Sequence, residues 1–293
     1  MELGRSLDGV WTLSSYTSFQ RPDELHWLAL TPAEAEAFEA PRRRLHGVPP
    51  SKPGELGQQE TEGAERGDGL GRVNGEIRSS WIVDPPDGRI PYTAEARARL
   101  HIGEPASALR IDNPEDLGGP DRCIANGAAG APMFAGPDAN LFQIVQTRDA
   151  VAILTEKYHD VRIIRLDQAP APPAPFSAPM GDSVGRWEGR TLVVETSRFQ
   201  PAPVQRGQGV VVSGETRVVE RFTRRSLTEL FYAFTVTDPT LFSRPWRGEM
   251  MLQVAPGRMY EYACHEGNYS LPSILRGAHL AQAGASATPP AGR

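Results

Sequence analysis

Short runs of β-branched and aromatic residues, separated by turn-forming residues, dominate the second half of the chain. Such runs are typical of β-strands, because branched and aromatic side chains pack well on a pleated surface. The pattern predicts eight strands: Phe142–Gln146, Val151–Tyr158, Val161–Leu166, Thr191–Thr196, Thr216–Arg224, Glu229–Val236, Trp246–Val254 and Met259–Cys264. Successive short strands at this spacing predict a mainly β fold, an antiparallel β-barrel or strongly curved sheet of lipocalin-like general architecture.

Helical signals are few and short. Thr31, followed by a proline and a glutamate, can cap a helix that Pro41 should end. Thr93 can cap a second short helix, and residues 271–284 are suited to a closing helix. The chain therefore carries a few short helices beside its strands.

The strand signal divides the chain into unequal parts. Residues 1–76 carry little of it, and residues 47–76 are rich in Gly, Glu and Gln, which is typical of a long loop. We expect a long N-terminal arm and loop over residues 1–76 that packs on a single barrel-like domain over residues 77–284. Residues 285–293, rich in Ala, Gly and Pro, should form a disordered tail.

Gly181 to Gly185 matches the GxSxG pattern of a nucleophile elbow. That elbow needs a strand before the serine and a helix after it. Here a Pro-rich stretch precedes the motif, and Trp187 to Arg190, which is typical of a hairpin corner, follows it. We interpret the motif as a turn.

Composition and charge exclude several function classes. The chain has 31 basic and 36 acidic residues and a net charge of -5, whereas nucleic-acid binders carry a basic patch. No run of 18 apolar residues predicts a membrane span, and residues 1–12 lack the apolar core of a signal peptide. We therefore expect a cytoplasmic protein that binds neither nucleic acid nor a membrane.

The chain contains only two cysteines, Cys123 and Cys264. Two thiols are too few for a four-thiolate zinc or iron–sulfur site. They could form one disulfide, but in a reducing cytosol we expect two free thiols. We expect no cofactor and no metal, although a mixed His, Glu and Asp metal site that uses His159 and His265 is an alternative.

Ionisable residues share strand faces with apolar ones. Because side chains alternate along a strand, one face of Thr216–Arg224 carries Val218, Glu220 and Phe222. If Val151–Leu166 keeps one register, Glu156, Tyr158 and Arg162 also share a face. A buried carboxylate without partners costs several kcal/mol. These groups therefore either face water or line a polar cavity.

Two of the six histidines sit beside acids near predicted strand ends, in Tyr158-His159-Asp160 and in Cys264-His265-Glu266. A neutral imidazole can take or give a proton near pH 7, and a nearby carboxylate raises its basicity. Each histidine is either a structural hydrogen-bonding residue or a proton-transfer group.

Five stretches together resemble a large family of bacterial proteins found in acidobacterial and proteobacterial genomes. They read DPPDGRIP from Asp84, HDVRII from His159, GRWEG from Gly185, ERFTR from Glu220 and YEYACHEGNY from Tyr260. The resemblance covers roughly residues 77–280. It implies that many relatives carry an export signal, and it implies no particular activity.

These features predict a cofactor-independent lyase or isomerase that works by acid–base catalysis. The substrate would be a hydrophobic, hydroxylated aromatic small molecule of phenylpropanoid or lignin-derived type, and the reaction a retro-aldol (aldehyde-releasing) cleavage or a dehydration. His159 would be the general base, oriented by Glu156 or Glu220, and Tyr260 or His265 the general acid. The expected substrate-binding residues are Arg162, Arg244, Trp246, Trp187, Tyr158, Tyr262, Glu266 and Asn268.

The alternative is a non-catalytic β-barrel that carries a hydrophobic ligand in the same cavity. In that case the histidines and glutamates would be structural or recognition groups. In either case the partner is a small molecule. Exposed sheet edges and the long arm also favour a homo-oligomer, since an arm can cover a neighbour's edge.

Overall fold

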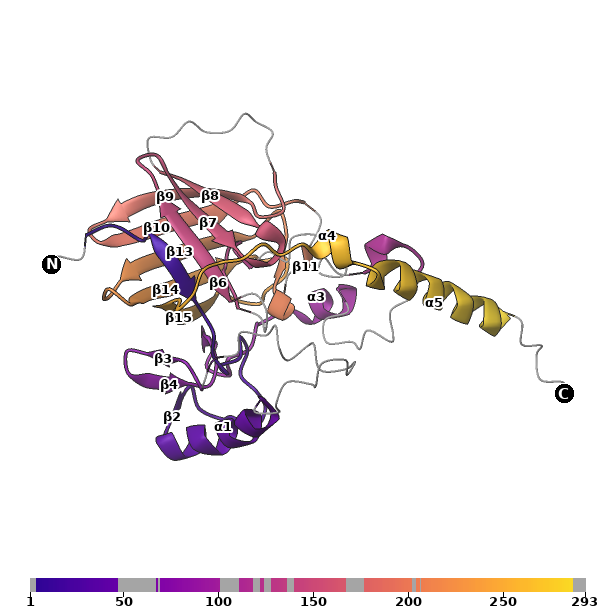
Figure 1. The fold of residues 1–293 in the computed structure, drawn as a ribbon, viewed down its shortest axis with the longest axis horizontal. Coiled ribbons are helices and arrows are strands. Elements are labelled where there is room, and N and C mark those ends of the chain that lie inside the picture. The colour runs from indigo at the N-terminus through magenta and orange to yellow at the C-terminus, as the bar shows by residue number, and fades with distance from the viewer. Residues whose placement is uncertain are drawn as a thin grey trace.

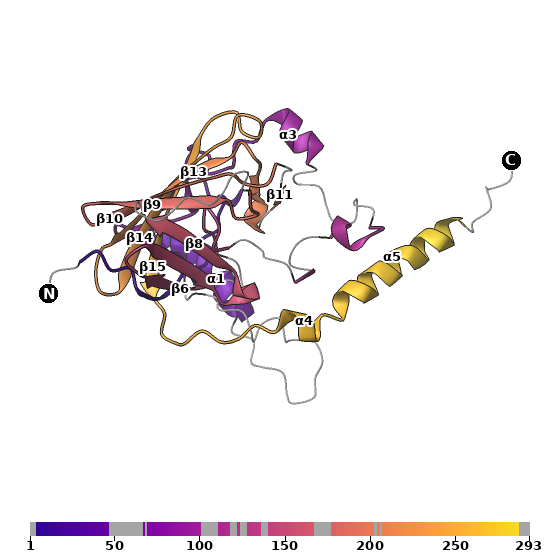
Figure 2. The same cartoon turned by 90° about the horizontal axis from the view of Figure 1, so that it is seen from above.

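Nine strands close into a β-barrel in the computed structural model (Figures 1 and 2). The structure describes residues 4–46, 67, 69–100, 111–117, 122–123, 128–135, 140–166, 177–201, 204–205 and 207–286. The barrel strands, in spatial order, are β1 (Gly9–Thr12), β6 (Leu141–Gln146), β7 (Ala150–Thr155), β8 (Val161–Leu166), β9 (Asp182–Glu188), β10 (Thr191–Ser197), β13 (Arg217–Arg224), β14 (Glu229–Thr237) and β15 (Trp246–Val254). Neighbouring strands are antiparallel except the parallel pair β8 and β9. The predicted barrel class is confirmed.

The barrel closes between its first and last strands. Trp11 of β1 pairs with Val254 of β15, while the start of β15 pairs with β5 (Ile82–Asp84) through Arg247 and Asp84. β1 and β5 share one edge of β15, and β14 pairs with the other edge, so both edges of β15 are occupied. The first strand comes from the segment that we described as an arm, so residues 1–76 supply part of the barrel as well as the elements outside it.

The remaining elements lie around the barrel. They are β2 (Ala29–Leu30), α1 (Pro32–His46), β3 (Arg72–Val73), β4 (Glu76–Arg78), α3 (Ala94–Arg99), β11 (Val204–Gln205), β12 (Val211–Val212), α4 (Cys264–Gly267), α5 (Ser270–Ser286) and the 3-10 turns Pro114–Asp116, Lys157–His159 and Gly207–Gly209. α1 packs on the small sheet β2-β4-β3, and α5 extends away from the barrel (Figure 2). No helix in the described part of the chain is both long and apolar enough to cross a membrane.

Helix α1 begins as predicted and ends later. The Glu34 carboxylate accepts the N–H of Thr31 at 2.8 Å, as in a capping box. The helix continues through Pro41 to His46, so the predicted end at Pro41 is wrong. Arg42 donates to the carbonyl of Phe38, and Arg43 pairs with Glu36 and Glu39; these contacts support the turn that contains the proline.

Seven of the eight predicted strands correspond to β6, β7, β8, β10, β13, β14 and β15. β9 was missed, because a glycine in its centre mimics a turn. A Cβ on Gly185 would lie 2.9 Å from the Cγ2 atom of Ile164, so close strand packing requires glycine there. The expected turn at Gly181–Gly185 is therefore mostly strand, whereas the hairpin corner after Trp187 is confirmed by Gly189 with φ +61°.

The predicted strand Met259–Cys264 is wrong. Residues 255–263 form an irregular segment, and Cys264 begins α4. The alternation of Tyr260 and Tyr262 with Glu261 imitates a half-buried strand, but these side chains are all exposed. Since both edges of β15 are occupied, the segment has no adjacent strand edge with which to pair.

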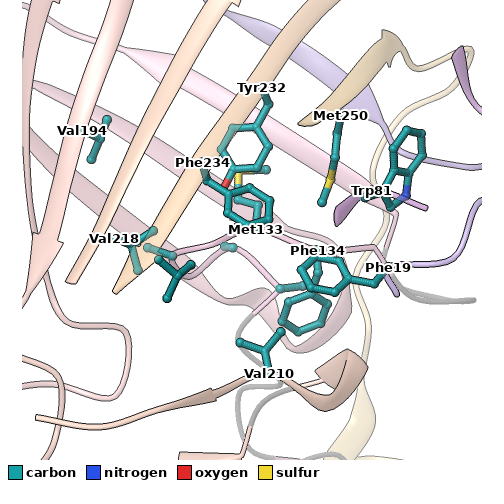
Figure 3. Packing of buried hydrophobic residues seen from close by; sticks show 14 of the residues in the cluster. Phe19, Trp81, Met133, Phe134, Val194, Val210, Val218, Tyr232, Phe234 and Met250 are labelled. Atoms are coloured by element: carbon teal, nitrogen blue, oxygen red, sulfur yellow. The ribbon is translucent and has the colours of Figure 1, made fainter. Parts of the chain in front are cut away.

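Large side chains pack the barrel interior (Figure 3). Fully buried inward-facing residues include Trp11, Phe142, Phe222, Tyr232, Trp246 and Met250. Residues 128–135 add Met133 and Phe134, which are also fully buried and lie among them (Figure 3). This packing differs from the open ligand cavity of a typical lipocalin-like barrel.

Candidate functional site

The structure divides the predicted site residues into three groups. Arg162 and Glu220 lie inside the barrel. Glu156, Tyr158, Tyr260, Tyr262, His265, Glu266 and Asn268 belong to the turn before β8 and the segment after β15. Trp187 and Arg244 belong to neither place, while Trp246 belongs to the apolar core of the barrel. The backbone of His159 lies in the 3-10 turn Lys157–His159, but its side chain is outside the described part of the structure, so its role as general base stays a prediction.

Arg162 and Glu220 form a fully buried ion pair. Arg162 donates from Nη1 to Oε1 of Glu220 at 2.9 Å and from Nη2 to Oε2. It also donates from Nε to Ser183 Oγ at 2.9 Å, from Nη2 to Thr196 Oγ1 at 2.8 Å, and from Nη1 to the Ala129 carbonyl at 3.4 Å. All five guanidinium N–H groups therefore have protein partners.

Tyr232 completes this cluster. Its hydroxyl donates to Glu220 Oε1 at 2.8 Å and accepts the N–H of Met133 at 2.7 Å. Burial raises the pKa of Tyr232 well above its usual range, and the Glu220 carboxylate raises it further. Burial acts to lower the pKa of Arg162, but the charge of Glu220 and its hydrogen bonds to Arg162 together outweigh burial, and the net shift is upward. The cluster thus holds an ion pair and an un-ionised phenol.

We call this set of five residues the interior polar cluster: Arg162, Ser183, Thr196, Glu220 and Tyr232. Each comes from a different strand, and the five strands β8, β9, β10, β13 and β14 are consecutive in the sheet. Strand alternation directs each side chain inward, and the partners on residues 128–135 are main-chain atoms. The cluster therefore anchors residues 128–135 inside the barrel.

This geometry changes the expected roles of two residues. The predicted shared register of Glu156 with Arg162 is wrong, because the turn Lys157–His159, with Tyr158 at φ +62°, interrupts the two strands. Glu220 is engaged by Arg162 and Tyr232 rather than by a histidine among the contacts described. Arg162 has no N–H left for a substrate oxygen, so we assign both residues a structural role.

The second group gathers at one end of the barrel. We call residues 255–270 the C-terminal strap, since they run from the end of β15 along the outside of the barrel (Figures 1 and 2). Glu156 Oε2 accepts the N–H of Tyr260 at 3.1 Å. The rings of Tyr158 and Tyr262 meet edge to face, with centroids 5.4 Å apart. The strap therefore brings together residues that are about a hundred positions apart in the sequence.

A disulfide between Cys123 and Cys264 also holds the strap. The prediction of two free thiols is wrong. It followed from the assumption of a reducing compartment, and sequence spacing alone could not show that two residues 141 positions apart would meet.

A groove of about 360 Å³ lies beside the disulfide. We call it the strap groove; it is lined by Cys123, Tyr262, Ala263, Cys264, Gly267, Asn268 and Ser270. The ammonium of Lys157 lies 5.3 Å from the ring centre of Tyr158 and 5.7 Å from that of Tyr262. This buried lysine fixes the aromatic pair next to the groove.

The strap side chains that we expected inside a dry cavity face water instead. Tyr260 is 75% exposed, and His265 and Glu266 are exposed as well. Of the predicted ionisable residues whose side chains the structure describes, Arg162 and Glu220 alone lie inside the barrel, so these side chains do not form a single interior site.

The third group is scattered. Arg244 pairs with Asp84 at 2.8 Å on the outside of the barrel. Trp246 is fully buried and packs edge-on against Phe234 and Phe242, so it belongs to the core and not to a substrate site. Trp187 is half-buried, with the guanidinium of Arg5 5.9 Å from its ring centre. These residues do not share a pocket with the strap groove.

Sequence reasoning missed Lys157, Tyr232, Thr196 and the role of Ser183. Thr196 and Tyr232 carry a detectable signal, since each is a polar residue in phase with inward-facing apolar residues of its strand. Lys157 carries none, because its position depends on a turn that strand periodicity concealed. Among the described side chains, no group of three His, Cys, Asp or Glu residues lies close enough to hold a metal ion.

Comparisons with protein-family models, with curated proteins and with solved structures gave no match. The assignment of a function therefore rests on the geometry of the chain itself.

Proposed function

We propose that this protein binds a neutral, hydroxylated aromatic small molecule in the strap groove. The observation that carries the proposal is the ring of Tyr262, which lines a groove of about 360 Å³ and is held from behind by Tyr158 and Lys157. Grooves lined by aromatic side chains and a few polar groups are typical of small-molecule sites.

The groove chemistry supports a neutral aromatic ligand. Tyr262 is 38% exposed, so part of its ring is available for stacking. Ser270 and Gly267 line the groove, and a serine hydroxyl and main-chain polar groups suit ligand hydroxyl groups. The exposed carboxylates of Glu261 and Glu266 lie in the same segment and disfavour an anionic ligand.

The interior of the barrel is a weaker candidate for the binding site. Its polar cluster has a protein partner for each guanidinium N–H, and aromatic side chains and residues 128–135 occupy the space. A ligand there would have to displace buried side chains. The filled interior therefore favours the non-catalytic alternative over chemistry inside the barrel.

A second candidate function is the predicted lyase or isomerase activity, with the reaction site at the strap and not inside the barrel. One contact favours it: Glu156, which precedes the turn that contains His159, holds the backbone of Tyr260 at 3.1 Å. His159 would act as general base and Tyr260 as general acid on a hydroxylated ligand in retro-aldol cleavage or dehydration. Tyr260→Phe would then abolish turnover and leave ligand affinity unchanged, whereas the binding function predicts no turnover in any variant.

Calorimetric titration tests the binding proposal. The probe is coniferyl alcohol, a hydroxylated phenylpropanoid, with 3-cyclohexylpropanol as the non-aromatic control. We expect coniferyl alcohol to bind and 3-cyclohexylpropanol not to bind. Tyr262→Ala should weaken the affinity for coniferyl alcohol about tenfold, because the aromatic contact is lost. Tyr269→Ala is the matched control, because Tyr269 is 79% exposed and is not part of the groove. Equal affinity in both tyrosine variants would contradict the proposal.

A further inference from the structure

We propose that the Cys123–Cys264 disulfide is a thiol-exchange site that accepts low-molecular-weight thiols through the strap groove. Both cysteines line the groove, and both side chains are half-buried rather than enclosed. A thiolate attacks a disulfide sulfur only where it has access to that sulfur. The groove supplies this access, with room for a small peptide thiol such as glutathione.

Among the contacts of the described residues, a side-chain hydrogen bond reaches one of the two sulfurs, and this difference predicts the direction of exchange. The side-chain amide of Asn268 donates from Nδ2 to Cys123 Sγ at 3.3 Å. This donor stabilises negative charge that develops on Cys123, and a better-stabilised thiolate leaves faster. The incoming thiolate therefore attacks Cys264 Sγ.

The step balances with two thiols as the reductant. The first thiolate, formed by loss of its proton to water, bonds to Cys264 Sγ while the bond to Cys123 Sγ breaks and Cys123 leaves as a thiolate. A second thiolate then attacks the sulfur of the bound thiol, releases the oxidised disulfide of the reductant and leaves Cys264 as a thiolate. Two electrons pass from the two thiols to the protein, and both cysteines take up protons from water.

Exchange would also release the strap. None of the described side chains from 255 to 283 is fully buried, so few apolar contacts hold this part of the chain. The disulfide is the covalent tether between the strap and residues 122–123. Reduction therefore removes one wall of the strap groove, and loss of aromatic ligand binding on reduction is a consequence that rests on the proposed function.

Mass spectrometry of partly reduced protein tests the direction of exchange without any ligand. The folded protein is treated with glutathione, quenched with acid, alkylated with N-ethylmaleimide and digested. We expect glutathione on Cys264 and the maleimide on Cys123. Glutathione mainly on Cys123, or no exchange without prior unfolding, would overturn the proposal.

A variant pair separates the hydrogen bond from the general exposure of the disulfide. Asn268→Leu removes the donor at similar volume, and we expect exchange about tenfold slower. Ser273→Ala removes a hydrogen bond at the start of helix α5, from Ser273 Oγ to the Tyr269 carbonyl, and should leave the rate unchanged. Equal rates in the two variants would contradict the assigned role of Asn268. Both outcomes are independent of coniferyl alcohol binding, so failure here is distinguishable from failure of the proposed function.

Discussion

The barrel interior and the C-terminal strap hold similar residue types in opposite settings. Inside the barrel, Arg162, Glu220 and Tyr232 are buried, and their polar atoms bond to one another and to the main chain of residues 128–135. On the strap, Tyr260 and His265 face water. The comparison teaches that an acid, an arginine and a tyrosine in one cluster do not make a reactive site when every donor is already used.

The largest expected effect comes from breaking the interior ion pair. Glu220→Ala leaves the Arg162 charge buried without its carboxylate, and we expect a loss of about 3–5 kcal/mol in the free energy of unfolding. Urea denaturation measures it. The double variant Arg162→Met with Glu220→Leu removes both charges, and it should recover most of that loss. A loss below about 1 kcal/mol for Glu220→Ala would show that the pair is not desolvated.

Tyr232→Phe removes a single hydroxyl from the same cluster. The Met133 N–H loses its acceptor and Glu220 loses one donor, so we expect a cost of about 1–3 kcal/mol in unfolding free energy. Because the ring stays in place, packing should not change. Hydrogen exchange of the Met133 amide is the direct readout, and unchanged protection of that amide would contradict the anchoring role of the cluster.

Asp238 provides a pH test of the buried polar groups. Burial acts to raise its pKa, but hydrogen bonds from Ser213, Thr240 and Thr216 outweigh burial and lower it below 3.8. As pH falls below 3.8 the unfolded chain takes up the proton first, so the stabilisation by Asp238 declines and is lost once the pH passes its folded pKa. Urea denaturation measured from about pH 5 down to about pH 2 should show a smaller decline in unfolding free energy for Asp238→Asn than for the wild type. Identical slopes of unfolding free energy against pH would contradict this assignment.

The smallest expected effect on stability belongs to the strap. Glu156→Gln weakens the acceptor for the Tyr260 N–H, and we expect unfolding free energy to change by no more than about 0.5 kcal/mol. Amide exchange of Tyr260 should nevertheless become faster. A large loss of global stability would show that the strap is part of the cooperative core and would remove the contrast between the two regions.

Much of the fold was predictable from the sequence, because strand periodicity reports burial directly. Val218, Glu220 and Phe222 share one face of their strand as the alternation predicts, and the structure shows that this face is the buried one. The prediction failed where the local pattern is typical of another element. Gly185 lies within strand β9 but is a typical turn residue, and residues 260–264 alternate like a strand but form none. Of the expected C-terminal tail, the structure describes residues 285 and 286, and residues 287–293 lie outside the described part. Residues 47–66 of the expected loop also lie outside it.

The candidate site was less predictable, because it depends on contacts between distant segments. Tyr158 with Tyr262 and Cys123 with Cys264 meet only through the closure of the barrel and the course of the strap. The disulfide is unusual for the reducing cytoplasm that we predicted. The small-molecule partner and the homo-oligomer stay predictions.

A nitrogen-15 NMR titration with coniferyl alcohol tests the central claim most directly, because it reports on both regions in one experiment. The account predicts chemical-shift changes at the amides of Tyr158 and of Tyr262 to Ser270, with the amides of Met133 and Tyr232 unchanged. Changes concentrated at Met133 and Tyr232, with the strap unaffected, would contradict it and place the ligand inside the barrel.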